Sequence, residues 1–552
     1  MPLQNNHYYP RLAGFFLLLL LTASSATNAQ IDRSKKEEIN ITATFKPSIV
    51  RTGKIEFRAE PPAKDTSGYQ FKYAITPFLF KTDIGPLEVK PLAYSADKDD
   101  RSGTGLYAKL GYGNVQNPFA AVSYTSNYKK DQFAVHLDHL SAKGKMPDQQ
   151  YANSSLMAKY RSLINEHQVA DFFAGYNYDA YRLYGFDHNS ISLPATDIRQ
   201  NYHHVFAGAS YEHISGSEGQ AIFTPSLRFD YLTSNKDVAE YGIAFKMPLS
   251  YNVSSHLQLQ SAFDVRATQL NKAGTKLEAT PLVQLPLALQ YARGLVTLKG
   301  GIIPVLKNKK IAVLPDLLLA YTFPESGLRV KAGISNLLDI NSMQKIIDIN
   351  PFVLPLDSLS VFHERQVYAG FDLFSTKGLQ LSVKSGFTRF ANMPLFANQG
   401  LLGKDFRMLN ESALDAIMLE GNLSYVFNNA LRFNSSVKGY SFQKQQVYDE
   451  AYGLLPLELS FKLEWSPLKP LKAKFATILW SGTMTQSAVN TDIKLEDAAD
   501  ISMGVEYKLN KKWALWIDLN NIANTRYLRW NQYPSFGFNF LAGVRYVFNK
   551  KD

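Results

Sequence analysis

The 552-residue chain contains no cysteine. This absence excludes disulfide bonds, thiolate catalysis, cysteine-ligated metals and a lipid-modified cysteine behind an export signal. Long apolar runs are also missing, because the run at residues 12–21 is shorter than the roughly 20 residues of a spanning helix and no later run reaches that length. The formal net charge is +11, yet no compact Lys/Arg tract stands out, so nucleic acid is not expected as a partner. These absences argue against a helical membrane protein and a thiol enzyme.

The start of the chain is typical of a secretory signal. Arg11 precedes the apolar run, and small residues end at Ala29, after which cleavage would leave Gln30 first. Residues 30–102 are polar and rich in proline, and we interpret them as a periplasmic extension. Insertion into a lumen, contact with a partner's surface and a simple linker all fit this composition.

The most regular pattern lies near the C-terminus, at residues 535–548. Its even positions are apolar or aromatic from Phe536 to Phe548, whereas its odd positions include Ser535, Asn539 and Arg545. A period of two over this length predicts a strand with one face in hydrocarbon and the other in a wetter interior. Such a strand must pair with the first strand, since a sheet edge exposed to lipid is not tolerated.

The same alternation recurs from residue 103 onward. It is clearest at residues 455–465, where apolar side chains oppose Glu458, Lys462 and Glu464. Ionised groups at every second position are costly in a dry core but cost little in a polar lumen. The sequence therefore predicts these candidate lumen-lining residues: His136, Asp138, Arg228, Asp230, Glu458, Lys462 and Glu464.

Connections between these segments alternate between short and long. Ten short turn candidates, with both termini on one side, predict an all-β transmembrane antiparallel barrel of about 22 strands, within a range of about 14 to about 22. These candidates lie near residues 128–131, 165–167, 215–218, 252–255, 293–294, 324–327, 375–378, 428–429, 467–470 and 510–512. The barrel should occupy residues 103–548, followed by a tail at 549–552. The links at residues 339–364 and 391–413 are unusually apolar; they could narrow the lumen, cover the mouth or dock a surface partner.

Residues 513–527, followed by Tyr533-Pro534 and the aromatic-ended last strand, resemble the C-terminal end of TonB-dependent receptor barrels, most of all the Bacteroidota type. Asn521, Asn524 and Tyr527 occupy positions of that family's Asn-Leu-Phe-Asp-x-x-Tyr motif, in which Ala523 replaces the Phe and Asn524 the Asp. The resemblance implies a receptor-type barrel, with Tyr527 as an anchor near the headgroups. The family's Ton box is not found, and too few residues precede residue 103 for its plug domain, so we expect a barrel without its own plug.

Three functions fit this interpretation. The first is receptor-type or channel-type transport of an unspecified small molecule across the outer membrane, gated by the N-terminal segment or a partner. The second is a non-conducting structural or assembly component that binds an envelope protein or lipoprotein. The third, an outer-membrane enzyme, is least supported: Asp187-His188 is a single adjacent pair, and His136 and Asp138 lack a third metal ligand nearby. No catalytic, metal or cofactor site is predicted, and outer-membrane lipid is the expected surrounding.

Overall fold

The computed structural model describes residues 104–550 except 214–220, 308, 325, 376–377, 401 and 429. The predicted signal (1–29) and periplasmic extension (30–102) lie outside these residues. Within the described part of the chain, no helix is long and apolar enough to cross a membrane.

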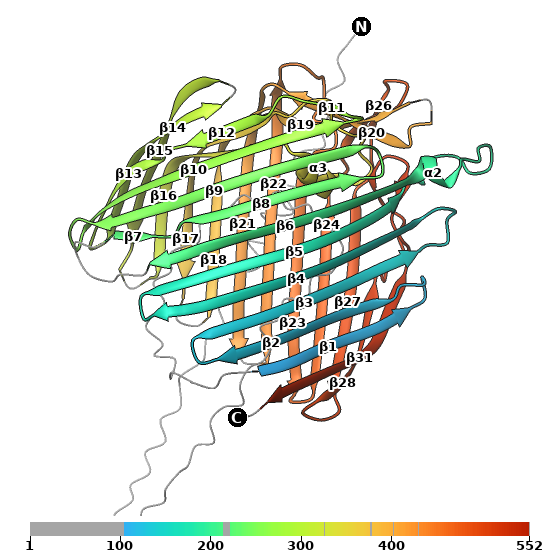
Figure 1. Ribbon diagram of the computed structural model, residues 1–552, viewed down its shortest axis with the longest axis horizontal. Helices are drawn as coiled ribbons and strands as arrows, with labels where there is room; N and C mark the ends of the chain where they lie inside the picture. Colours follow the sequence, from blue (N-terminus) through green and yellow to red (C-terminus); the bar gives the residue numbers. More distant parts are fainter. Residues whose placement is uncertain are drawn as a thin grey trace, which may run out of the picture. The chain divides into compact units, whose positions relative to one another are not determined.

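The chain forms a closed antiparallel barrel of 22 strand positions, as predicted (Figure 1). Two positions are each built from two strands, β7 with β8 and β12 with β13, because Pro225 and Pro286 interrupt the backbone ladder there. The strands of the wall are β1 (Thr104–Gly113), β2 (Phe119–Tyr128), β3 (Asp131–Lys143), β4 (Gln150–Asn165), β5 (Gln168–Arg182), β6 (Arg199–His213), β7 (Ala221–Phe223), β8 (Ser226–Ser234), β9 (Val238–Asn252), β10 (Leu257–Lys272), β12 (Thr280–Gln284), β13 (Leu287–Arg293), β14 (Val296–Lys307), β15 (Lys310–Thr322), β16 (Leu328–Ile340), β17 (Val361–Phe374), β18 (Leu379–Ala391), β21 (Leu414–Asn428), β22 (Leu431–Gln445), β23 (Leu457–Leu468), β24 (Leu471–Trp480), β27 (Ala498–Lys508), β28 (Trp513–Asn520) and β31 (Asn539–Lys550).

The last strand closes the barrel by pairing with the first, as the sequence pattern predicted. β1 and β31 run antiparallel from the pair Thr104 and Lys550 to the pair Gly113 and Leu541. β31 continues two residues beyond Phe548, into the predicted tail, because Asn549 and Lys550 pair with β1.

Short and long connections lie at opposite rims of the barrel (Figure 1). The short-turn rim carries connections such as 129–130, 166–167, 253–256, 469–470 and 509–512, all at predicted turns. The predicted turn at 215–218 lies outside the described residues. The long-loop rim carries the helices α2 (Ala195–Ile198) and α3 (Met343–Ile349) and the short strands β11 (Thr275–Lys276), β19 (Met393–Gln399), β20 (Asp405–Glu411), β25 (Met484–Gln486), β26 (Asp492–Lys494), β29 (Leu528–Trp530) and β30 (Tyr533–Pro534).

The outer face of the wall is apolar and exposed. On β15, for example, Leu317, Leu319 and Tyr321 are exposed, while Asp316 on the opposite face pairs with Lys299 of β14 at 2.6 Å. An apolar band on the outside of a closed barrel with a polar inside is the arrangement of a transmembrane barrel. In such barrels the short turns face the periplasm and the long loops face outward.

Candidate functional site

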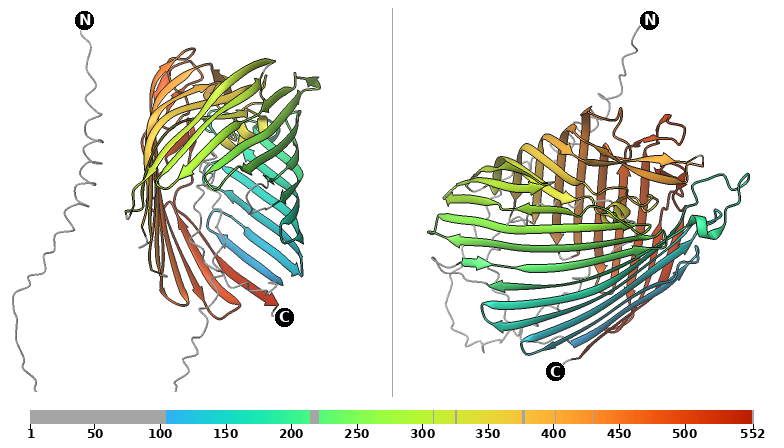
Figure 2. Two further views of the ribbon diagram at one scale, coloured as in Figure 1. Left: turned by 90° about the vertical axis from the view of Figure 1, so that its left-hand side faces the viewer. Right: turned by 45° about the horizontal axis from the view of Figure 1, so that its top comes forward.

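Five long-loop segments fold together at one rim, and we call them the cap: residues 341–360, 392–413, 446–456, 481–497 and 521–538. Figure 1 draws α3, β19, β20 and β26 together at this end, and Figure 2 shows the α3 ribbon between the walls of the barrel. Of the predicted apolar links, 339–364 and 391–413 both contribute. Ile346 and Ile347 of the first link and Phe396 and Phe406 of the second are buried in the cap.

The cap segments form a hydrophobic core together with residues of the wall. Phe352 stacks on Tyr533 with ring centroids 3.7 Å apart, and the Phe396 and Phe406 rings meet Trp530 edge-on at 5.2 and 5.6 Å. Aromatic contacts of this kind stabilise a core beyond the area they bury. Several barrel residues complete this core, which comprises Tyr184, Tyr202, Leu232, Val238, Leu270, Met343, Ile346, Ile347, Val353, Leu356, Phe396, Phe406, Trp530 and Tyr533.

Backbone hydrogen bonds join the cap segments to one another. The Leu354 N–H donates to the Phe406 carbonyl at 2.7 Å, and the Phe406 N–H donates to the Phe352 carbonyl at 3.1 Å. Phe396 and Gly453 likewise donate to the Tyr452 and Met484 carbonyls. These bonds join four of the five cap segments into one interlocked layer.

Polar side chains attach α3 to the wall. The Glu240 carboxylate of β9 accepts hydrogen bonds from the N–H groups of Met343 (2.5 Å) and Gln344 (3.2 Å), the first two residues of α3. A carboxylate at this position satisfies backbone donors that a helix leaves unpaired. From β6, the Gln200 amide donates to the Val353 carbonyl at 3.3 Å.

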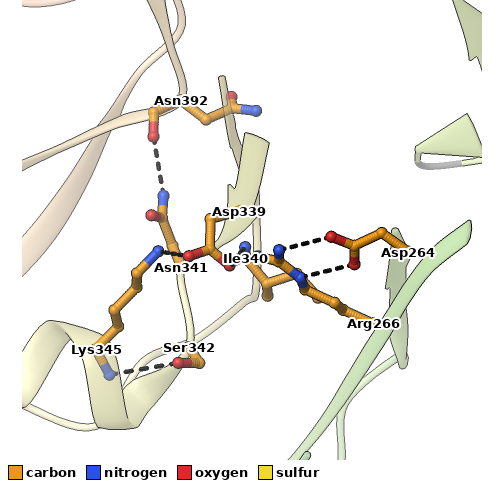
Figure 3. Close-up of polar contacts among 8 residues, drawn as sticks. All are labelled: Asp264, Arg266, Asp339, Ile340, Asn341, Ser342, Lys345 and Asn392. Carbon is orange, nitrogen blue, oxygen red and sulfur yellow. Dashed lines mark hydrogen bonds and ion pairs between the residues drawn. The ribbon is translucent and has the colours of Figure 1, made fainter. Parts of the chain in front are cut away.

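Arg266 of β10 extends this attachment across the interior (Figure 3). Its guanidinium is paired with Asp264 on the same strand at 2.8 Å and with Asp339 at the end of β16 at 3.0 Å. Asp339 also accepts from the Lys345 ammonium of α3. Next to this cluster the Asn341 amide donates to the Asn392 carbonyl at 2.9 Å, which ties the two predicted links together.

Two of the predicted lumen residues form a compact cluster on the wall. Arg228 and Asp230 lie on the face of β8 opposite the exposed Phe229 and Tyr231, and they pair at 2.7 Å. His204 of β6 reaches the same carboxylate at 2.8 Å. The ring of the adjacent His203 lies against Tyr176 and Tyr178 instead.

The other predicted residues lie elsewhere on the wall. On β3, His136 contacts Asp138 and lies 2.5 Å from the Ser123 hydroxyl. On β23, Glu458 is opposite Lys438 of β22, and Glu464 lies between Arg432 and Lys474 in the register. Lys462 is opposite Asn434. Opposite charges paired across strands favour this sheet register.

No reactive constellation emerges from the predicted histidines and carboxylates. The Asp187 carboxylate accepts from the Asn189 N–H and the Ser190 hydroxyl, while His188 stacks on Phe186 at 4.0 Å. Within the described residues, no group of three or more histidine or acidic side chains could hold a metal ion.

The C-terminal motif takes part in the cap rather than in the lipid interface. The Asn521 amide donates to the Thr525 and Phe536 carbonyls, and Asn521 and Asn524 both have positive φ angles. The Tyr527 hydroxyl donates to the buried Asp500 carboxylate at 2.5 Å. The expectation of a headgroup anchor at Tyr527 is wrong, because the loop folds inward and the hydroxyl meets a carboxylate on the face of β27 opposite the exposed Met503 and Tyr507.

Glu240, Arg266 and Lys345 are the contacts that the sequence did not single out. The spacing of Asp264 and Arg266 repeats that of Arg228 and Asp230, so the same alternation argument could have marked them. Glu240 and Lys345 offered no local signal, since each acts through a partner on another segment.

Comparisons with known proteins agree with this architecture. No family model and no curated protein matches the chain. Solved structures with the same fold include the copper transporter OprC (TM-score 0.62, 12% identity, 81% of each chain covered) and the FrpB iron transporter of Neisseria meningitidis (0.62, 10%, 82% of each). The siderophore receptor PirA of Acinetobacter baumannii is another (0.60, 8%, 81% of this chain and 80% of that one).

The chain is thus a 22-stranded β-barrel of the bacterial outer membrane. Its fold is that of TonB-dependent receptor barrels, in agreement with the resemblance of its C-terminal stretch.

Proposed function

We propose that this protein is a receptor-type transporter for a small solute, in which the cap closes the outer mouth and opens when solute binds. The observation that carries the proposal is that most residues of the cap core belong to the cap itself and that side-chain polar contacts from Glu240, Gln200 and Asp339 attach α3 and its loop to the wall. A unit whose core comes mainly from its own segments, with a few polar attachments, can move without unfolding the barrel.

The similar structures support transport as the general role, since they include a copper transporter, an iron transporter and a siderophore receptor. We propose that the cap takes over closure of the outer mouth. We propose that the inner mouth is closed by the segment before β1 or by an envelope partner protein or lipoprotein.

We further propose that His136, Asp138, Arg228, Asp230, Glu458, Lys462 and Glu464 line the solute path. Alternation supports this placement for Arg228 and Asp230, whose strand neighbours Phe229 and Tyr231 are exposed. Acidic and basic groups are mixed along the proposed path, which does not favour one sign of solute charge.

Single-channel conductance of residues 30–552 in planar bilayers tests the proposal. The intact chain should be closed, whereas an E240Q/D339N variant should show openings because two attachments of α3 are weakened. R389Q is the matched control, since Arg389 is paired with Asp415 of β21 at 2.6 Å and is 64% exposed. Deletion of residues 31–102 tests closure of the inner mouth separately.

A non-conducting structural component is the second candidate, and the dense hydrogen bonding among the cap segments favours it. The transport proposal fails if the intact chain, the E240Q/D339N variant and the 31–102 deletion all fail to conduct, and if the E240Q/D339N change combined with the deletion also fails to conduct. Stable co-purification with an envelope protein would then support the structural role. The similar structures are transporters and receptors, and we propose no catalytic activity.

A further inference from the structure

Five lysines gather on one part of the short-turn rim, and we call them the lysine arc: Lys129, Lys130, Lys469, Lys511 and Lys512. They lie on the β2–β3, β23–β24 and β27–β28 turns. The strands follow one another around the barrel as β23, β24, β27, β28, β31, β1, β2 and β3 (Figure 1). With neighbouring strands about 4.8 Å apart, the arc spans roughly 34 Å across the closing seam.

The arc has little charge compensation. All five side chains are exposed, and within the described residues none of them forms an ion pair. Lys130 donates to the Ile164 carbonyl, and the nearby Asp131 carboxylate accepts from Tyr160 and Ser162. Outside the three turns of the arc, the described residues of the short turns include one charged residue, Glu166 of the β4–β5 turn. Arg293, the last residue of β13, adds one charge at a strand end. Positive charge is therefore concentrated at the seam, where it attracts an anion.

An apolar and aromatic surface adjoins the lysines on the outside of the wall. Trp513 is exposed, and its ring lies 4.7 Å from that of Tyr546. The Lys512 ammonium lies 5.8 Å from the Phe548 ring centroid. Tryptophan and tyrosine mark the headgroup level of a bilayer. The neighbouring outward side chains are also exposed, namely Tyr128, Trp465, Leu468, Tyr507 and Leu509.

We propose that the lysine arc binds anionic glycerophospholipids of the leaflet at the short-turn rim. The lysines supply point charges for the phosphate, and the apolar surface beside them accommodates the acyl chains. This combination favours a lipid over a free anion, which has no use for the aromatic surface. The inference rests on the rim alone and holds whether or not the barrel transports a solute.

Native mass spectrometry of the intact protein in detergent tests the proposal, with phosphatidylglycerol and phosphatidylcholine titrated separately. The test variant is K129Q/K511Q/K512Q. The matched control, K276Q/K310Q/K494Q, removes three exposed lysines from the opposite rim. Each surface lysine near an anionic membrane contributes about fivefold to binding. We therefore expect the test variant to lose at least tenfold in phosphatidylglycerol affinity and the control to bind like the natural chain.

Heat-modifiable migration on a gel shows whether each variant is folded before the comparison. Equal binding of the two lipids by the natural chain, or equal phosphatidylglycerol binding by test variant and control, would overturn the proposal. Competition by inorganic phosphate at equal concentration would assign the arc to a free anion instead. The natural chain could instead bind poly-glutamate through these lysines and show no preference between the two lipids. That result would assign the lysine arc to an acidic protein and would also overturn the proposal.

Discussion

Asp339 neutralises two cations that reach it from different segments, Arg266 of the wall and Lys345 of α3. In D339N the charge is lost and the two cations face each other without a carboxylate between them. Hydrogen bonds to charged groups contribute about 1.5–3 kcal/mol when partly buried. We expect hydrogen exchange in residues 341–360 to accelerate by about tenfold or more, measured by mass spectrometry.

Asp357 provides the control within the same loop. It pairs with Lys272 at 2.5 Å but is 91% exposed, and exposed ion pairs contribute little. D357N should therefore exchange like the natural chain. If the natural chain, D339N and D357N all exchange at the same rate in residues 341–360, Asp339 does not hold α3.

Glu411 makes the cap sensitive to acid. Its carboxylate is fully buried and accepts hydrogen bonds from the N–H groups of Ala413, Gln446, Val447 and Tyr448. Burial acts to raise the pKa of Glu411, but these bonds outweigh it and hold the pKa below the ordinary 4.5. Because the folded pKa is lowered, the carboxylate stabilises the cap above pH 4.5, and this contribution is lost as the pH falls through the folded pKa.

Exchange of residues 446–456, corrected for intrinsic rates, should therefore accelerate below pH 4.5. E411Q should exchange fast at neutral pH and show a weaker pH dependence. D449N, an exposed change in the same segment, should retain the natural profile. A natural chain whose exchange is flat down to pH 3 would contradict this role of Glu411.

At the scale of elements, the hairpin of β19 and β20 supplies much of the cap core. Phe406 is fully buried against Trp530 and Tyr533. Truncation of a buried Phe to Ala costs about 3–5 kcal/mol, so F406A should loosen the cap. Trypsin should then cut after Lys404 or Arg407 while the barrel still migrates as a folded, heat-modifiable species.

F387A is the matched change on the wall, since Phe387 is 69% exposed on the outer face. It should leave the hairpin resistant to trypsin. Complete unfolding of the F406A barrel would mean that cap and wall fold as one unit, contrary to the independence that the transport proposal requires.

The elements also show what the sequence can predict. Alternation and turns are local, so residues 455–465 and 535–548 predicted two strands and the turn signals predicted about 22. The bounds were less exact, because β23 starts at Leu457 and β31 starts at Asn539, four residues later than predicted. The cap depends on contacts between distant segments: Tyr533 donates to the Lys404 carbonyl, and Glu240 meets Met343. Apolar composition marked two cap loops as unusual, but composition does not show which segment each loop packs against. For the same reason Tyr527 was expected near the headgroups and not in the cap.

For the whole barrel, closure depends on the close approach of β1 and β31. Gly111 and Gly543 are directly paired there, and a Cβ added to Gly543 would lie 1.9 Å from the Leu110 carbonyl oxygen. That oxygen belongs to the backbone and cannot move aside without breaking ladder bonds, which lipid would leave unsatisfied. G543A should therefore reduce the fraction of heat-modifiable, folded barrel after refolding into lipid vesicles.

Gly300 on β14 offers the matched control, because nothing lies within 4 Å of a Cβ added there. G300A carries the same chemical change in a wall strand and should fold like the natural chain. If G543A folds equally well, the strands tolerate a wider seam than the structure has. If it alone fails, one methyl group at the seam prevents assembly of all 22 strands, because an unclosed barrel leaves two edges in hydrocarbon rather than one weakened pair.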